Sequence, residues 1–251
     1  MRGRPMLVID DDLGSRETVR EILAGQNFDV CSASGGPAGI DIARAAQPAA
    51  IFIGMGVSGG DGISRCALLK QDPILRSIPL VGITDSPDLR YTQRAFGAGV
   101  EFFLSNPFSE AGLVAVAELA LELAQRGTPM HRRCHHPRFP VEVPVRCLLR
   151  DAEATRKVVG QTGNMSLGGL LLLLPGRVPA RSVFRFQLRL PDATVTAEGA
   201  HVWQKPQPCC DGRTRHGVRL LRFVEDVGLV RYRHYLSQVA AARAPMRQPA
   251  A

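Results

Sequence analysis

The first 125 residues alternate short apolar runs with longer stretches of helical periodicity, and this pattern constrains the fold most. Each run of strand length precedes a stretch with apolar residues at helical spacing. Such repeats form a doubly wound α/β fold, a five-stranded parallel sheet with helices on both faces. The predicted strands are 6–9, 29–32, 50–53, 78–83 and 100–104. Ser15 is the predicted cap of the first helix, which has Val19, Ile22 and Leu23 on its apolar face. The other predicted helices are 39–46, 63–70, 89–96 and 110–125.

The second half of the chain changes to short runs with a period of two. Segments 141–145 and 184–190 place alternate residues on opposite faces of a strand. Several short strands separated by turn residues predict a small antiparallel β-barrel, followed by a helix. The further strand candidates are 158–159, 169–174, 194–203 and 217–223, and the closing helix is 227–240.

The charge of the chain is uneven and supports two domains. Residues 1–125 hold 10 Lys+Arg and 15 Asp+Glu, a net charge of −5, and the other residues hold 21 and 8, a net charge of +13, which sum to the formal +8. A basic domain favours an anionic ligand. The predicted domains are 1–125, a linker at 126–130, the barrel domain at 131–238 and a flexible tail at 239–251.

Composition excludes two classes of protein. No apolar run approaches the ~20 residues that span a bilayer, and three aspartates end the first apolar run, which excludes a secretory signal. We therefore expect a cytoplasmic protein with reduced cysteines, most of them buried and Cys209-Cys210 an exposed pair. A metal site stays open as an alternative, although no CxxC pair supports it and Pro137 disfavours a helix there. Its ligands would come from His131, Cys134, His135, His136, Cys209 and Cys210.

Polar residues follow several of the predicted parallel strands. Val8-Ile9-Asp10-Asp11 ends the first strand, Asp61-Gly62 follows the third, Thr84 the fourth, and Asn106-Pro107-Phe108 the fifth. Taken alone, the acidic residues are also compatible with a solvated loop. Together these residues resemble the receiver domain of response regulators, over residues 5 to about 125. The resemblance implies a flavodoxin-like fold in which an acidic pair and an aspartate after the third strand hold Mg²⁺, and that aspartate takes a phosphoryl group.

Two parts of the receiver pattern are missing from this chain. The phosphoacceptor lies seven residues before the Asp-Gly pair, and here that residue is Gly54. The position of the phosphate-binding lysine is Asn106. We therefore expect a vestigial site at Asp10, Asp11, Gly54, Thr84 and Asn106, without phosphorylation and with weak Mg²⁺ binding at most. The resemblance then leaves protein–protein contact as the role of this domain, with a second copy of the chain among the open partners.

Two segments carry the signal in the basic half. The first is His131-Arg132-Arg133-Cys134-His135-His136-Pro137-Arg138, before the barrel, and the second is Asn164-Met165-Ser166-Leu167-Gly168-Gly169, before a leucine-rich strand. Together they resemble the PilZ domain, a receptor for cyclic di-GMP, over roughly residues 131–238. That family has an RxxxR segment and a [D/N]xSxxG turn. Here Arg133 and Arg138 are five residues apart, and Cys134 stands four before Arg138.

The resemblance implies a site for two phosphates and two guanines. Arginine pairs with phosphate through two parallel hydrogen bonds and can also meet a guanine edge. Asn164 and Ser166 offer an amide and a hydroxyl to a guanine, and Gly169 lets the backbone come close. The expected cyclic di-GMP site is Arg132, Arg133, Arg138, Asn164, Ser166 and Gly169.

These features predict a bacterial signalling adaptor rather than an enzyme, since no nucleophile–base pair or phosphate-cradling glycine loop is present. Such an adaptor would bind cyclic di-GMP and regulate motility or biofilm behaviour. The main alternative is a ligand-independent scaffold in which both domains are degenerate. Nucleic-acid binding by the basic half is a third reading, but no recognition helix or zinc finger supports specific recognition. We expect no metal and no catalytic cofactor.

Overall fold

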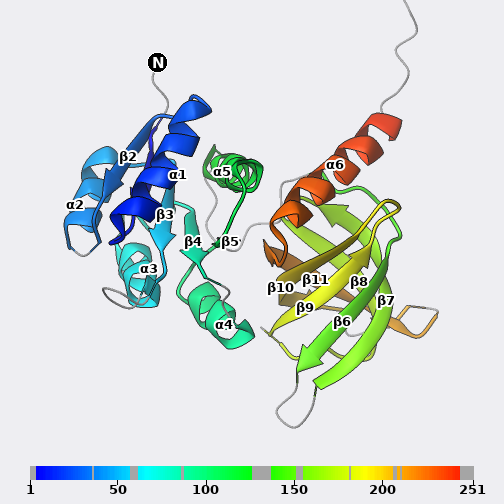
Figure 1. Cartoon of the computed structure of the whole chain (residues 1–251). Coiled ribbons are helices and arrows are strands. Elements are labelled where there is room, and N and C mark those ends of the chain that lie inside the picture. Colours follow the sequence, from blue (N-terminus) through cyan, green and yellow to red (C-terminus); the bar gives the residue numbers. More distant parts are fainter. Residues whose placement is uncertain are drawn as a thin grey trace, which may run out of the picture. The chain divides into compact units, whose positions relative to one another are not determined.

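The computed structural model describes residues 4–35, 37–56, 62–85, 88–125, 137–150, 155–180, 182–205, 208–209 and 211–243. Figure 1 gives the order of the helices and strands along the chain. No helix in these stretches is long and apolar enough to cross a bilayer. The chain forms two compact units, Met1–Arg133 with Leu221–Val227, and Cys134–Leu220 with Gly228–Ala251.

A five-stranded parallel sheet lies at the centre of the first unit, as the sequence predicts. Its strand order is β2-β1-β3-β4-β5, so the carboxyl ends of β1 and β3 lie next to each other. Every residue of β1 and β3 is buried, because helices cover both faces of the sheet. The strands are β1 Met6–Ile9, β2 Val30–Ala33, β3 Ala50–Gly54, β4 Leu80–Thr84 and β5 Phe102–Ser105.

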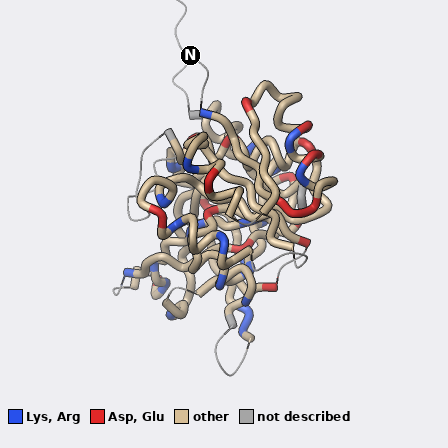
Figure 2. The backbone as a smooth tube through the Cα atoms, turned by 90° about the vertical axis from the view of Figure 1, so that its left-hand side faces the viewer, with Lys and Arg blue, Asp and Glu red and all other residues tan. Residues whose placement is uncertain are grey.

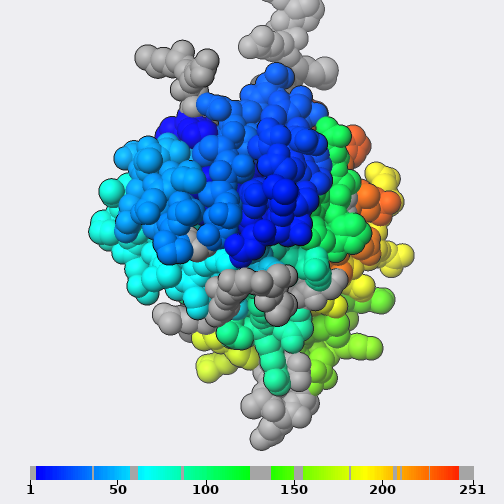
Figure 3. Space-filling view, turned by 60° about the vertical axis from the view of Figure 1, so that its left-hand side comes forward, coloured from blue at the N-terminus to red at the C-terminus, as the bar shows by residue number. Residues whose placement is uncertain are grey.

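Five helices flank this sheet (Figure 1). α1 packs against α5, and α3 against α4. The near surface in Figure 3 belongs to the N-terminal part of this unit, drawn in blue. The helices are α1 Leu13–Gly25, α2 Pro37–Ala46, α3 Gly62–Gln71, α4 Leu89–Gly97 and α5 Glu110–Gln125. The predicted bounds of the strands, and of α2 to α5, agree with these to within two residues.

The start of α1 differs from the prediction. Asp12, not Ser15, is the N-cap residue, because the Asp12 carboxylate accepts a hydrogen bond from the Ser15 backbone N–H at 2.6 Å. The Ser15 hydroxyl instead donates to Asp10 Oδ2 at 2.9 Å. Aspartate and serine are both good capping residues, so the sequence alone did not separate the two.

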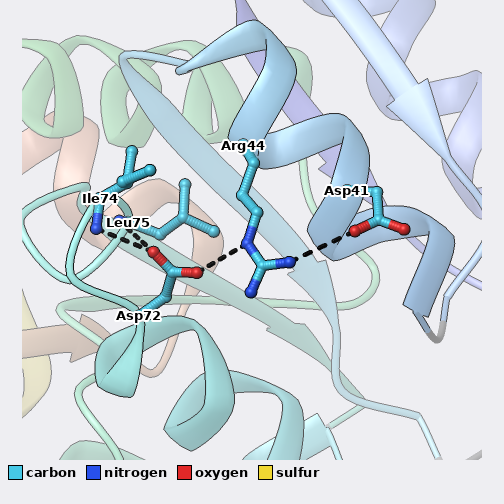
Figure 4. A network of polar contacts seen from close by, with 5 residues as sticks. All are labelled: Asp41, Arg44, Asp72, Ile74 and Leu75. Carbon is cyan, nitrogen blue, oxygen red and sulfur yellow. Dashed lines mark hydrogen bonds and ion pairs between the residues drawn. The ribbon is translucent and has the colours of Figure 1, made fainter.

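An ion-pair network joins α2 to the segment after α3 (Figure 4). Arg44 donates to Asp72 at 2.8 Å and to Asp41 at 3.4 Å. Asp72 also accepts from the backbone N–H groups of Ile74 and Leu75. The hydrogen bond from Arg44 is the main cause that lowers the pKa of Asp72 from its ordinary value. Figure 2 shows the positions of the acidic and basic residues along the backbone.

Six strands of the second unit close into the predicted antiparallel barrel. Their order is β10-β11-β8-β7-β6-β9. Leu170, Leu172 and Leu174 of β8 are fully buried, and they alternate with half-buried Leu171 and Leu173. Alternate residues therefore fill the barrel and face outward, as a period of two requires. The strands are β6 Pro144–Arg150, β7 Thr155–Ser166, β8 Gly169–Pro175, β9 Val183–Arg189, β10 Thr194–Gln204 and β11 Arg213–Phe223.

Strand β7 is much longer than the predicted 158–159 segment. Gly160 and Gly163 interrupt its apolar pattern, and the pairing with β8 shifts register between Thr162 and Asn164. A Cβ on Gly160 would lie 2.2 Å from the carbonyl oxygen of Leu173. Gly160 interrupts the apolar pattern of the strand in the sequence, and the close approach of β8 requires a glycine at this position.

Besides β11, which begins at Arg213 and not at the predicted residue 217, two other elements have bounds that differ from the predictions. β6 begins at Pro144, within the predicted 141–145 segment, and continues to Arg150. The closing helix, α6, spans Asp226–Arg243, so it continues past residue 240 into the expected 239–251 tail. The predicted helix and strand types are confirmed in both cases, and only the ends move.

Candidate functional site

The hairpin between β7 and β8 contains the Asn-x-Ser-x-x-Gly pattern. Ser166 ends β7, Gly169 begins β8, and the two residues pair across the hairpin. The Ser166 hydroxyl donates a hydrogen bond to the Gly169 carbonyl oxygen at 3.0 Å. A Cβ on Gly169 would lie 2.5 Å from the carbonyl oxygen of Val218 on β11, so only glycine fits there. The serine and the glycine of the pattern therefore hold the shape of this hairpin.

Ser166 is turned toward the protein and not toward solvent. Its exposed fraction is 0%, and its carbonyl oxygen accepts a hydrogen bond from the Tyr232 hydroxyl at 2.8 Å. Tyr232 lies on α6 and is itself fully buried. In this conformation the Ser166 side chain supports the hairpin, in contrast with the expected contact between its hydroxyl and a guanine edge.

Arg138 and Asn164 lie together on the outside of the barrel. Phe139 and Met165 exchange two backbone hydrogen bonds of 2.9 Å each, so the segment before β6 runs beside β7. This pairing lets Arg138 Nη1 donate to Asn164 Oδ1 at 2.9 Å. Arg138 is exposed and Asn164 half-buried, so a ligand can reach both side chains. The structure thus brings this arginine to the β7–β8 hairpin.

Several residues of the predicted sites lie outside the described residues. These are Arg132 and Arg133 of the ligand site, and His131, Cys134, His135, His136 and Cys210 of the alternative metal site. In the part of the chain that the structure describes, no three His, Cys, Asp or Glu side chains gather as metal ligands do.

The described cysteines are free thiols. Cys66 and Cys147 are buried as expected, and burial raises the pKa of Cys147 to about 12. Cys31 is half-buried. Cys209 is half-buried too, so the expectation of an exposed Cys209 is wrong. The N–H of Cys209 donates to the carbonyl oxygen of Arg213, which holds it in the turn between β10 and β11.

The carboxyl ends of β1 and β3 meet in an acidic corner, which we call the acid pocket: Asp10, Asp11 and Gly54. Asp10 Oδ1 accepts from the Asp12 backbone N–H at 3.0 Å, and its Oδ2 accepts from the Ser15 hydroxyl at 2.9 Å. A Cβ on Gly54 would lie 2.3–2.5 Å from the three carboxyl atoms of Asp10. The Asp10 carboxylate therefore fills the space that a side chain at position 54 would take.

The second carboxylate of the acid pocket has a cationic partner. Asp11 Oδ2 pairs with Arg65 Nη2 at 2.5 Å, and Asp11 Oδ1 accepts from the Gly35 backbone N–H at 2.9 Å. Arg65 lies on α3, and Gly35 follows β2. The loops after β1 and β2 and helix α3 are thereby joined through one carboxylate.

Thr84 and Asn106 lie side by side at the ends of β4 and β5. The Asn106 backbone N–H donates to the Thr84 carbonyl oxygen at 2.9 Å, and the Asn106 amide donates to Asp85 at 2.9 Å. The amide thus pairs with a neighbouring carboxylate. Phe103 is buried beside Gly82 and packs inside the domain. Asp61 lies outside the described residues.

A buried histidine pair in the barrel has no counterpart in the sequence predictions. His201 on β10 and His216 on β11 are 4% and 0% exposed, and their ring nitrogens lie 3.5 Å apart. His216 Nε2 is also 3.2 Å from the Gly176 carbonyl oxygen. Burial lowers the pKa of both histidines, and the neighbouring ring lowers that of His216 further. Their sequence signal is weak, since the two residues share no short motif.

Arg65 and Tyr232 are the other residues that the sequence did not single out. Each acts across a long separation in the chain, on Asp11 and on Ser166 respectively. Neither occupies a position of the receiver-like or PilZ-like patterns described above. Only the folded structure shows that they contact the two candidate sites.

Comparison with known proteins assigns both halves of the chain. The model of the response regulator receiver domain matches residues 6–118, and that of the PilZ domain matches residues 131–226. Both are domains of signal-transduction proteins.

The similar proteins match the first half of the chain. The DNA-binding response regulator MtrA of Mycolicibacterium paratuberculosis is 28% identical over 115 residues, which are 46% of this chain and 49% of that protein. The response regulator PleD of Caulobacter vibrioides is 29% identical over 110 residues, 44% of this chain and 24% of that protein. The chain thus covers about half or less of the length of these relatives.

One solved structure that is similar to part of the chain is the chemotaxis protein CheY4 of Vibrio cholerae. It is 19% identical, covers 47% of this chain and 98% of its own, and has a TM-score of 0.45. The strand order and the family matches agree on the first half, and the closed barrel agrees with the match on the second. The chain is therefore a fusion of a response regulator receiver domain with a PilZ domain.

Proposed function

We propose that this chain is a non-enzymatic signalling adaptor whose PilZ domain binds cyclic di-GMP and whose receiver domain contacts a protein partner. The observation that supports the ligand most is the contact between Arg138 and Asn164 beside the β7–β8 hairpin. A guanidinium can form parallel hydrogen bonds with a phosphate and can stack on a base. The Asn164 amide next to it can meet a guanine edge.

The ligand site in this proposal has two layers. Arg132, Arg133, Arg138 and Asn164 contact the ligand, and Ser166 and Gly169 hold the hairpin that positions Asn164. The domain extents that we propose are 1–125 for the receiver domain, 126–130 for the linker, 131–238 for the PilZ domain and 239–251 for the tail.

The receiver domain in this proposal is not phosphorylated. Gly54 stands at the phosphoacceptor position and has no carboxylate to accept a phosphoryl group. Asn106 cannot supply the positive charge that a lysine would bring to the phosphate. Protein contact is then the remaining role, with a second copy of the chain among the open partners. We further propose a cytoplasmic protein that regulates motility or biofilm behaviour.

Calorimetric titration of the full chain with cyclic di-GMP tests the ligand. We expect saturable binding that Arg138→Ala weakens by about 10- to 150-fold, because a charge-assisted hydrogen bond contributes about 1.5–3 kcal/mol. Arg189→Ala is the matched control, since Arg189 is exposed at the end of β9 and makes no contact with the hairpin residues in the described structure. Its affinity should equal that of the wild type. Absence of heat up to ~100 μM ligand would contradict the proposal.

A ligand-independent scaffold is the second candidate. Two observations favour it: the five-residue spacing of Arg133 and Arg138, and the burial of Ser166. A scaffold predicts that Arg138→Ala leaves cellular activity and partner binding unchanged, whereas the adaptor predicts loss of the cyclic di-GMP response. Pull-down of the partner with and without cyclic di-GMP separates the two.

A further inference from the structure

We propose that the guanidinium of Arg65 takes the place of the divalent cation in the acid pocket and holds the pocket in a metal-independent arrangement. The receiver family implies Mg²⁺ at Asp10 and Asp11, but the residues of this chain do not fit it. The inference rests on the proposed absence of phosphorylation and adds to it the residue that neutralises the pocket.

The first step is the loss of one metal ligand. A Mg²⁺ ion requires near-octahedral oxygen ligands at the pocket. Gly54 supplies no carboxylate. The Asp10 carboxylate lies in the space that the Cβ of a side chain at position 54 would take. Two hydrogen bonds, from the Asp12 N–H and the Ser15 hydroxyl, hold Asp10 there. Asp10 is therefore committed to protein contacts.

The second step is the charge on Asp11. Arg65 Nη2 lies 2.5 Å from Asp11 Oδ2, and the Arg65 side chain is only 14% exposed. A cation shielded from water interacts with a carboxylate more strongly than an exposed one does. A positive charge at this distance also repels a second cation. Asp11 is thus neutralised by the protein itself.

The third step is the room made for the guanidinium. A Cβ on Gly35 would lie 2.3 Å from Asp11 Oδ1 and 2.7 Å from Arg65 Cζ and Nη1. The absence of a side chain at Gly35 lets the guanidinium lie against the loop after β2, and the Gly35 N–H also donates to Asp11. Gly35, Asp11 and Arg65 thus form one close contact between the loops after β1 and β2 and helix α3.

The test measures Mg²⁺ binding to the full chain by calorimetry in a Gly54→Asp background, which restores the third carboxylate. We expect Gly54→Asp alone to bind Mg²⁺ weakly, because Arg65 still pairs with Asp11. Gly54→Asp with Arg65→Ala should bind at least about tenfold more tightly. Gly54→Asp with Arg65→Lys keeps a cation and should remain close to Gly54→Asp.

Arg44→Ala is the matched control. Arg44 pairs with Asp72 and Asp41 in the same domain (Figure 4), and none of these three residues belongs to the acid pocket. In the Gly54→Asp background this change should leave the Mg²⁺ affinity unaltered. Circular dichroism and urea denaturation show whether each variant is folded.

Equal Mg²⁺ affinity with and without Arg65 in folded protein overturns the inference. An equal gain from Arg44→Ala overturns it too, because the effect would then come from net charge. The proposed function fails in a different way, if the unaltered chain takes up a phosphoryl group from acetyl phosphate, seen as a mass increase. The two failures are therefore distinguishable.

Discussion

At the residue scale, glycines decide which contacts the two candidate sites can make. Gly54 leaves its space to the Asp10 carboxylate, and Gly35 leaves room for Arg65. Gly169 lets the hairpin approach the backbone of β11. In each case a missing Cβ permits a close contact, so the effect of adding a methyl group depends on whether the neighbouring atom can move.

Replacement of Gly169 by alanine should therefore destabilise the PilZ domain. The new Cβ would meet the Val218 carbonyl oxygen at 2.5 Å, and a strand backbone cannot yield. We expect a loss of about 1–3 kcal/mol in the free energy of unfolding, measured by urea denaturation. Gly163→Ala is the control, because its Cβ would meet only the Leu171 and Leu173 side chains, at 3.0 Å or more. A larger loss from Gly163→Ala would contradict this explanation.

The residue scale also shows where sequence reasoning stops. The pattern of Asn164, Ser166 and Gly169 predicted a turn at this position, through its resemblance to the PilZ family. The same pattern could not show that the Ser166 hydroxyl faces inward, since this depends on Tyr232 from a distant helix. Arg65 was missed for the same reason: its partner is 54 residues away.

At the scale of elements, β10 and β11 bury two histidines against each other. Their pKa values are lowered because burial disfavours the charged ring. The unfolded chain, with ordinary histidine pKa values of 6.5, binds more protons below that pH than the folded barrel does. The contribution of these two histidines to the free energy of unfolding is therefore fully present above pH 6.5. It falls as the pH decreases toward their lowered pKa values in the folded barrel.

Acid should thus weaken the barrel. We expect the free energy of unfolding to fall by up to about 1.4 kcal/mol per pH unit for each histidine below pH 6.5. Urea denaturation at pH 7.5 and pH 5.5 measures the difference. In His201→Gln with His216→Gln the difference should shrink, since neither residue then titrates. An equally large pH effect in this double variant would show that other groups cause it.

Element type was predictable throughout, whereas element length was not always so. The helices and parallel strands of the first unit have strong apolar patterns, and their predicted ends lie close to the observed ones. In β7 the apolar pattern is broken by Gly160 and Gly163, which serve the close approach of β8 and a register shift. Backbone contacts of this kind leave no apolar signature, so the strand looked short.

At the scale of the whole molecule, an acidic receiver domain and a basic PilZ domain share one chain. The receiver domain carries an acid pocket in which Asp11 pairs with Arg65, and the PilZ domain carries Arg138 beside its hairpin. On our proposals, only the second domain has a small-molecule ligand. The adaptor would then respond to one signal, with the first domain supplying a constant surface.

The affinity for cyclic di-GMP should therefore not depend on phosphorylation conditions. We expect the same dissociation constant with and without Mg²⁺ and acetyl phosphate, because on our proposals Gly54 accepts no phosphoryl group and Arg65 occupies Asp11. Calorimetric titration of the full chain under both conditions measures this. A several-fold change in the dissociation constant would contradict this expectation and would show that another group of the chain senses these additives.

The hydroxyl of Tyr232 provides a route by which a nucleotide bound at the β7–β8 hairpin would affect α6. The Tyr232 hydroxyl, on α6, donates a direct and buried hydrogen bond to the carbonyl oxygen of Ser166. A ligand that displaces the hairpin would therefore act on α6 through this hydrogen bond. Tyr232→Phe would remove this hydrogen bond and keep the ring. In that variant a bound ligand would then displace the hairpin without displacing α6.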